Sequence, residues 1–416
     1  MAVETTAAAA RAALRSARSL AGAGAVVAVA SMAVNGLAAV VPVLAAGLLP
    51  PAQVGALVAL LGVGAVASVV GTGLQTALAV RWARQATVAG AGRVSLLTAG
   101  LTTGALLFGV PMIAWALHVP ALQAVLLALL TGPVILAGRW LGELQGRQSY
   151  GRLAAGMLLL GFGRYGGVLA ALAVGLGVTA SLAVGAGASV ASVVVIAALP
   201  GTNAGAPTAS GQDRERRVRA REVLRAGGAS IAMLAISYAD LLLAQALLPG
   251  ADAGAYAVGS VLSKGALWAP GALTVLALPM FARARRHAVR ITLACTAACG
   301  VVLIGASALF ADLAVGIVGR GQYPHLAGYA PAFATVGALY ALVFVLVNAE
   351  IAAHVARPAL WLWIALGAMV AAAVVVRPTT VGGVLTLSII TATLTLAATT
   401  AARAVRGARA ATRGPR

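Results

Sequence analysis

Charged residues are scarce in this chain of 416 residues. Asp, Glu, Lys and Arg together make up 9%, whereas soluble domains carry about 25%. Acidic residues number only nine, and Lys264 is the single lysine among 29 basic residues. Apolar residues account for 61%. Such a composition excludes an ordinary water-soluble domain and predicts an integral membrane protein.

The residue patterns of enzymes and metal sites are also missing. The four histidines (118, 287, 325 and 354) are scattered, and neither a phosphate-binding Gly-rich loop nor a nucleophile paired with a base occurs. The two cysteines, Cys295 and Cys299, lie one helical turn apart in an apolar run, a spacing that favours neither a disulfide nor a metal site. We therefore expect no enzymatic activity, no metal and no cofactor. Without a nucleotide-binding domain, transport would depend on an ion gradient or on the membrane potential.

Long apolar runs dominate the chain, and the strand-like alternation that a membrane barrel needs is absent. The fold class is therefore an all-α membrane protein with about 12 transmembrane helices. Windows of about 20 residues place the spans at 22–48, 53–80, 94–117, 120–138, 153–176, 178–199, 226–248, 253–280, 291–314, 327–350, 358–376 and 380–402.

The two halves of the chain repeat each other. Residues 48–56 (LLPPAQVGA) return 199 positions later as residues 247–255 (LLPGADAGA), with six of nine positions identical. Because each half holds six spans, an even number, the second half enters the membrane in the same direction as the first. The pattern predicts two parallel-repeat six-helix lobes around a central cavity.

Arginine distribution predicts the orientation. If the chain starts inside, 25 of the 29 basic residues fall in cytoplasmic segments, and only Arg320 and Arg377 fall in outer loops. Both termini are then cytoplasmic. The net charge is +20, but the basic residues do not form a basic domain and are not interleaved with aromatic residues, as they are in nucleic-acid-binding proteins. We expect contact with anionic membrane lipids and no nucleic acid.

These patterns divide the chain into five parts. The parts are a cytoplasmic N-terminal segment at 1–20, an N-lobe at 21–200, an inter-lobe linker at 201–225, a C-lobe at 226–402 and a basic tail at 403–416. We expect the linker to be a solvated connector with a short surface helix, and the tail to be a disordered segment on the inner leaflet. The richness in Ala, Gly and Arg indicates a GC-rich bacterial genome, and hence a bacterial cell membrane.

Three ionisable residues lie near the middle of predicted spans: Arg164, Asp240 and Lys264. A charge at the centre of a membrane helix costs about 2.5–3.5 kcal/mol even on lenient scales, so each needs a partner or water. One interpretation is a structural ion pair, either Arg164 with Asp240 or Lys264 with Asp240. The other is a polar cavity that binds substrate.

Lys264 shares a predicted helical face with Ser260 and Tyr256, at intervals of four residues. A polar stripe on an apolar helix is typical of a helix that lines water. Asp240 has Ser237 and Tyr238 beside it. Weaker candidates for the same lining are Glu350, Asn348, Gln75 and Thr76, and Asn35 is expected to find a hydrogen-bond partner on a neighbouring helix.

Short motifs in both halves resemble polysaccharide-export flippases, a branch of the multidrug/oligosaccharidyl-lipid/polysaccharide exporter (MOP) superfamily. They are LLP at 48–50 with Gly55, GTGLQTA at 71–77 with Arg81, GELQGR at 142–147, YAD at 238–240, LPGADAGAY at 248–256 and LPMFAR at 278–283.

The resemblance implies that a polyprenyl-pyrophosphate-linked oligosaccharide moves from the inner to the outer leaflet by alternating access of two lobes. Arg164 and Lys264 would hold the pyrophosphate, with Tyr256 and Ser260 beside them, while Asp240 or Glu350 would carry a coupling ion. Polymerase and assembly proteins of the polysaccharide pathway are further expected partners. With only two cationic residues inside, the predicted cavity is sparser than is usual for glycan flippases.

Three other functions fit parts of the pattern. One is a cation-coupled drug or metabolite exporter of the same superfamily. Another is a facilitator-type transporter, but its signature loop needs an acid that RWARQ at 81–85 lacks. The third is a non-transporting membrane scaffold of a glycan-assembly complex. The three charged residues predicted inside the membrane argue against it, because a scaffold has no need of them.

Overall fold

The computed structural model describes residues 2–83, 90–199, 220–268, 286–353, 355 and 357–412, and in this part of the chain every regular element is helical. The N-lobe consists of α1 (Ala2–Ala46), α2 (Pro51–Trp82), α3 (Ala91–Phe108), α4 (Val110–Leu117), α5 (Ala121–Gly146), α6 (Tyr150–Gly161), the π-helical turn η1 (Phe162–Gly166), α7 (Gly167–Ala173) and α8 (Val178–Ala198).

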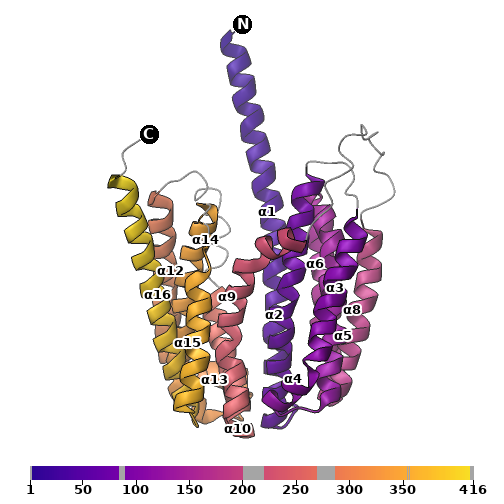
Figure 1. The fold of residues 1–416 in the computed structure, drawn as a ribbon, viewed down its shortest axis with the longest axis vertical. Helices are drawn as coiled ribbons and strands as arrows, with labels where there is room; N and C mark the ends of the chain where they lie inside the picture. Colours follow the sequence, from indigo (N-terminus) through magenta and orange to yellow (C-terminus); the bar gives the residue numbers. More distant parts are fainter. Residues whose placement is uncertain are drawn as a thin grey trace.

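The C-lobe stands beside the N-lobe, and the start of α1 and the end of α16 lie at the same end of the molecule (Figure 1). Its elements are α9 (Ala220–Leu247), α10 (Gly250–Trp268), α12 (Arg286–Leu309), α13 (Ala311–Gly319), the 3₁₀ turn η2 (Pro324–Tyr329), α14 (Ala330–Ala352), α15 (Leu360–Val376) and α16 (Val381–Thr412).

The described helices agree with the predicted spans. Ten are long and apolar enough to cross a membrane, and α15 is a shorter apolar helix. α10 corresponds to the predicted span 253–280 but is described only as far as Trp268. The spans predicted at 94–117 and 291–314 are each interrupted, at Gly109 and Phe310. The chain is a multi-span all-helical membrane protein.

The prediction of a disordered basic tail from residue 403 was wrong, because α16 continues as a helix to Thr412. Ala and Arg, which make up seven of the ten residues from 403 to 412, are both strong helix formers, and a helix already begun extends at little cost. The predicted linker at 201–225 falls mostly outside the described residues, and α9 begins within it at Ala220.

The interface between the lobes, where α2 packs against α9 and α10, explains why both copies of the motif contain a glycine. Gly55 near the start of α2 faces Gly254 near the start of α10, and a Cβ on Gly55 would lie 3.0 Å from the Gly254 amide nitrogen. A Cβ on Gly254 would overlap the carbonyl of Pro51. The glycine shared by both copies of the motif therefore permits the two helix starts to touch.

Candidate substrate cavity between the lobes

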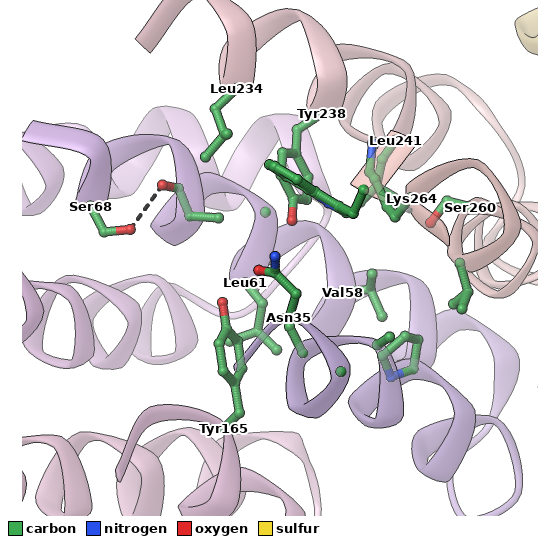
Figure 2. A pocket seen from close by; sticks show the side chains of 18 of the residues that line it. Asn35, Val58, Leu61, Ser68, Tyr165, Leu234, Tyr238, Leu241, Ser260 and Lys264 are labelled. Carbon is green, nitrogen blue, oxygen red and sulfur yellow. Dashed lines mark hydrogen bonds between the residues drawn. The ribbon is translucent and has the colours of Figure 1, made fainter. Parts of the chain in front are cut away.

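A cavity of about 520 Å³ lies between the lobes. It is lined by α1, α2 and η1 of the N-lobe and by α9 and α10 of the C-lobe, whose side chains converge on one space (Figure 2). Its polar lining consists of Asn35, Ser68, Thr72, Arg164, Tyr165, Ser230, Tyr238, Ser260 and Lys264. The two cations come from different lobes, and neither Asp nor Glu occurs among the described lining residues.

Arg164 is the N-lobe cation, and its side chain is bonded to α2 at two positions. Its Nη1 donates to Ser68 Oγ at 3.1 Å and its Nη2 donates to the Leu61 carbonyl at 3.3 Å. The guanidinium carbon lies 5.0 Å from the ring centre of Tyr165. Arg164 sits in η1, and a π-helical turn of this kind re-aims side chains within a helix and is frequent at functional sites. The charge is fixed in place without a carboxylate from any residue that the structure describes.

Lys264 is the C-lobe cation, and its surroundings differ in one respect. It donates to the Ser237 carbonyl and lies over the ring of Tyr238, 4.5 Å from the centre. In addition, its Nζ is 3.8 Å from Asp240 Oδ1. Of the two ion pairs left open by the sequence, the structure contains the one between Lys264 and Asp240.

Asp240 itself faces the interior of the C-lobe, not the cavity. Its side chain is 2% exposed, and its Oδ2 accepts a hydrogen bond from the Tyr256 hydroxyl at 3.1 Å. Tyr256 is fully buried and packs edge-on against Phe333, with ring centres 5.1 Å apart. Lys264 therefore connects the cavity to a buried acidic group behind it.

The predicted polar stripe on α10 is only partly right. Ser260 and Lys264 line the cavity, but Tyr256 is not among the lining residues. The reason is helical geometry: at 100° per residue, eight residues rotate the side chain by about 80° beyond two full turns. Tyr256 is thereby turned into the C-lobe, where it meets Asp240.

The weaker candidates lie elsewhere. Glu350 is buried and forms an ion pair with Arg406 of α16, outside the cavity lining. Gln75 bonds Gln145 of α5 at 2.8 Å, so it joins two helices of the N-lobe. The Thr76 hydroxyl and the Asn348 amide each donate to a carbonyl four residues earlier.

Asn35 does line the cavity, and its amide makes no hydrogen bond to any other described residue. The expected partner on a neighbouring helix is thus missing from the described part of the chain. An exposed amide at this place offers both a donor and an acceptor to a ligand.

Two neighbours of Arg164 were not anticipated: Ser68 and Tyr165. Both line the cavity with it. Ser68 is a lone hydroxyl in the apolar run between Gln53 and Thr72, and this isolation is the signal that could have marked it as a partner for a buried cation.

Solved structures with the same architecture cover nearly the whole chain. An inward-facing multidrug-resistance MATE-family transporter of the MOP superfamily matches with a TM-score of 0.68 and 14% identity, over 89% of this chain and 94% of that chain. An outward-facing MATE-family transporter matches with a TM-score of 0.59 and 15% identity, over 92% and 95%.

A third match is a MOP-superfamily transporter from Pyrococcus furiosus, described as having a binding pocket of reverse polarity that suggests a different function. Its TM-score is 0.58 at 15% identity, over 91% of this chain and 94% of that chain. No protein-family model and no curated protein matches the sequence. At this level of identity the likeness concerns the fold: the chain has the two-lobed fold of MOP-superfamily transporters.

Proposed function

We propose that this protein is a flippase that moves a polyprenyl-pyrophosphate-linked oligosaccharide from the inner to the outer leaflet of a bacterial cell membrane, by alternating access of its two lobes. One observation carries the proposal. The cavity between the lobes presents one cation from each lobe, Arg164 and Lys264, and none of its described lining residues is acidic.

Such a lining favours an anionic ligand over a cationic one. A pyrophosphate diester carries two charges and several acceptor oxygens, which suit an arginine fork on one side and a lysine on the other. Burial between the lobes strengthens these interactions, because the surrounding dielectric is low. A ligand held by both cations would bridge the two lobes, so its binding would couple to the movement of one lobe against the other.

The remaining lining suits the neighbouring sugars. Asn35, Ser260 and Tyr238 offer hydrogen-bonding groups and an aromatic face at the same cavity. About 520 Å³ is the volume of a small-molecule site. In this conformation the cavity has room for the pyrophosphate and the sugars next to it, while a longer glycan would extend out of it.

The membrane potential can drive such a step. Each elementary charge that crosses the membrane is worth about 2.3 kcal/mol per 100 mV. A cytoplasm that is negative inside favours the net outward movement of negative charge over a transport cycle, so export of a lipid dianion needs no ATP.

The main alternative is a cation-coupled drug or metabolite exporter, a function that the MATE-family neighbours suggest by name. Two positive charges in the cavity oppose the binding of cationic drugs. The Pyrococcus furiosus neighbour, with its pocket of reverse polarity, is a precedent within the same fold for a transporter that departs from that function.

Deletion of the gene in its host tests the proposal. The expected result is that lipid-linked glycan accumulates in the inner leaflet and surface polysaccharide falls, and that neither Arg164→Met nor Lys264→Met restores them from a plasmid. Arg152→Met is the matched control, because Arg152 is an exposed arginine of the neighbouring α6 and lies outside the cavity lining. Unchanged glycan with altered resistance to toxic cations would support the exporter; full rescue by all three variants would support a scaffold.

A further inference from the structure

The two cavity cations differ in what neutralises them. Within the described part of the chain, Arg164 has neutral partners only, a serine hydroxyl and a carbonyl, beside the ring of Tyr165. Lys264 has a carboxylate, Asp240, with 3.8 Å between Nζ and Oδ1. Arg164 is therefore available to an anionic ligand, whereas Lys264 is already paired with a carboxylate.

The carboxylate in turn depends on Lys264. Asp240 Oδ2 accepts a hydrogen bond from Tyr256, but Oδ1 is buried and has no hydrogen-bond partner among the described residues. The ammonium group of Lys264 is thus the main compensation for its charge. If Lys264 moved away, a buried carboxylate would be left uncompensated, a state that proteins avoid by protonation.

Lys264 is placed to make such a move. Its side chain is 16% exposed, compared with 2% for Asp240, and it lines the cavity that Asp240 does not reach. A lysine side chain is long and flexible, and its ammonium can exchange partners by rotation about its four-carbon stem. An anion bound at Arg164 would lie across the same cavity.

We propose that Lys264 is a switching counter-ion that couples anion binding to proton uptake. An anionic headgroup draws the ammonium of Lys264 from Asp240 into the cavity. The carboxylate of Asp240 then accepts one proton from hydronium of the aqueous phase, which is left as water, and forms an O–H bond at Oδ1. This inference rests on the proposed function, because the anion is taken to be the pyrophosphate of the lipid-linked glycan.

The charges then balance. With the proton bound, a dianion faces two cations, Arg164 and Lys264, and Asp240 is neutral, so the loaded site carries no net charge. Without the proton the same site carries one negative charge inside the membrane. Charge at the membrane centre is costly, so the neutral, protonated complex is the favoured one for the transport step.

Among the described residues around this site, Asp240 is the one carboxylate. The other described ionisable groups that face it are Tyr238, Tyr256 and Tyr340 with Lys264, and tyrosines stay neutral at ordinary pH. α2 and α15, which pack against α9, contribute no acidic residue or histidine in their described parts. Among the described residues of α14 and α16, Glu350, Arg403 and Arg406 form a separate group.

The test measures anion binding and proton uptake together, with the purified full-length protein. The probe is a short-chain prenyl-pyrophosphoryl sugar, a diester whose charge stays constant over the pH range of the titration. We expect about one proton taken up per probe bound, and binding that tightens by up to about tenfold for each unit of falling pH. Asp240→Asn should abolish proton uptake and bind the probe at neutral pH at least as tightly as the native protein.

Glu350→Gln is the matched control, because Glu350 is also a buried carboxylate but is paired with Arg406 outside the cavity lining. It should keep the full proton uptake; loss of uptake in this variant and not in Asp240→Asn would overturn the proposal. The double variant Lys264→Met/Asp240→Asn should bind the probe weakly at every pH.

A second probe, sulfate, separates the switch from the flippase. Binding of the prenyl probe without proton uptake would leave the flippase standing and refute the switch. Proton uptake with sulfate, but no binding of the prenyl probe, would support the switch and refute the flippase. If neither probe binds, both proposals are wrong.

Discussion

Arg164 and Lys264 line the same cavity from different lobes and have similar surroundings, each beside a tyrosine ring and each bonded to a backbone carbonyl. The lobes differ in the third partner, which is a serine hydroxyl for Arg164 and a carboxylate for Lys264. An arginine cannot lose its proton, so the N-lobe contributes a constant charge. The C-lobe contributes a charge that its own carboxylate can mask. The difference indicates that the N-lobe holds the anion and that the C-lobe responds to it.

The largest difference between the two cations is expected in the stability lost when each is removed alone. Lys264→Met leaves the carboxylate of Asp240 buried without its partner, which should cost about 3–5 kcal/mol of stability. Arg164→Met strands no carboxylate and should cost clearly less. Thermal unfolding in detergent, followed by the loss of folded protein, measures both.

The double variant Lys264→Met/Asp240→Asn is the control for that experiment. It removes both charges at once, so it should recover most of the stability but none of the transport. Equal losses of stability for Lys264→Met and Arg164→Met would contradict the distinction between a masked and an unmasked cation.

A smaller effect is expected when the positive charge at residue 164 is kept but the guanidinium is replaced by an ammonium group. Arg164→Lys preserves the positive charge but cannot reach both Ser68 and Leu61 with a planar fork. The loss of one charged hydrogen bond is worth about 1.5–3 kcal/mol. Transport of lipid-linked glycan should fall by about tenfold or more, whereas Lys264→Arg, which keeps the charge and can still pair with Asp240, should retain most of the transport. Arg164→Lys with native transport would show that charge alone suffices.

The two glycines of the repeated motif, Gly55 in the N-lobe and Gly254 in the C-lobe, also differ in their surroundings. A Cβ at Gly254 meets the backbone of Pro51, which cannot move aside, whereas a Cβ at Gly55 first meets the side-chain oxygen of Gln245 at 2.5 Å. Overpacking costs about 1–3 kcal/mol, so Gly254→Ala should lie at the upper end and Gly55→Ala at the lower. Thermal unfolding orders them, with Gly36→Ala, where a Cβ meets nothing within 4 Å, as the reference. The reverse order would contradict the close approach of α2 to α10.

Much of the fold could be predicted because the bilayer imposes a length on each apolar run. The positions of α5, α8 and α14 follow from hydropathy alone, and the parallel repeat follows from the motif around Gly55 and Gly254. The helical tail was missed because its charges, which end the apolar span, do not end the helix.

The candidate site could be predicted only in part. The cost of burying charge identified Arg164, Asp240 and Lys264, but it did not determine which cation pairs with the acid. That choice depends on the rotation of α10, which brings Lys264 to Asp240, and on contacts such as that of Arg164 with Ser68, 96 residues away in sequence. Glu350 resembled the other buried carboxylate in sequence, yet its partner Arg406 lies in a segment that was assigned to the tail.

Ser68→Ala should have the smallest effect, and it tests what fixes the N-lobe cation. The hydroxyl accepts from Arg164 Nη1 and donates to the Ala65 carbonyl at 2.8 Å. Its loss should weaken binding of the prenyl probe by about 0.5–1.5 kcal/mol, because water in the cavity can replace one neutral partner. Ser31→Ala, which removes a hydroxyl bonded only to Val27 of its own helix, should leave binding unchanged. If Ser68→Ala abolished binding as completely as Arg164→Met, the position of the guanidinium, and not its charge, would determine recognition, and the N-lobe would be the more finely adjusted of the two.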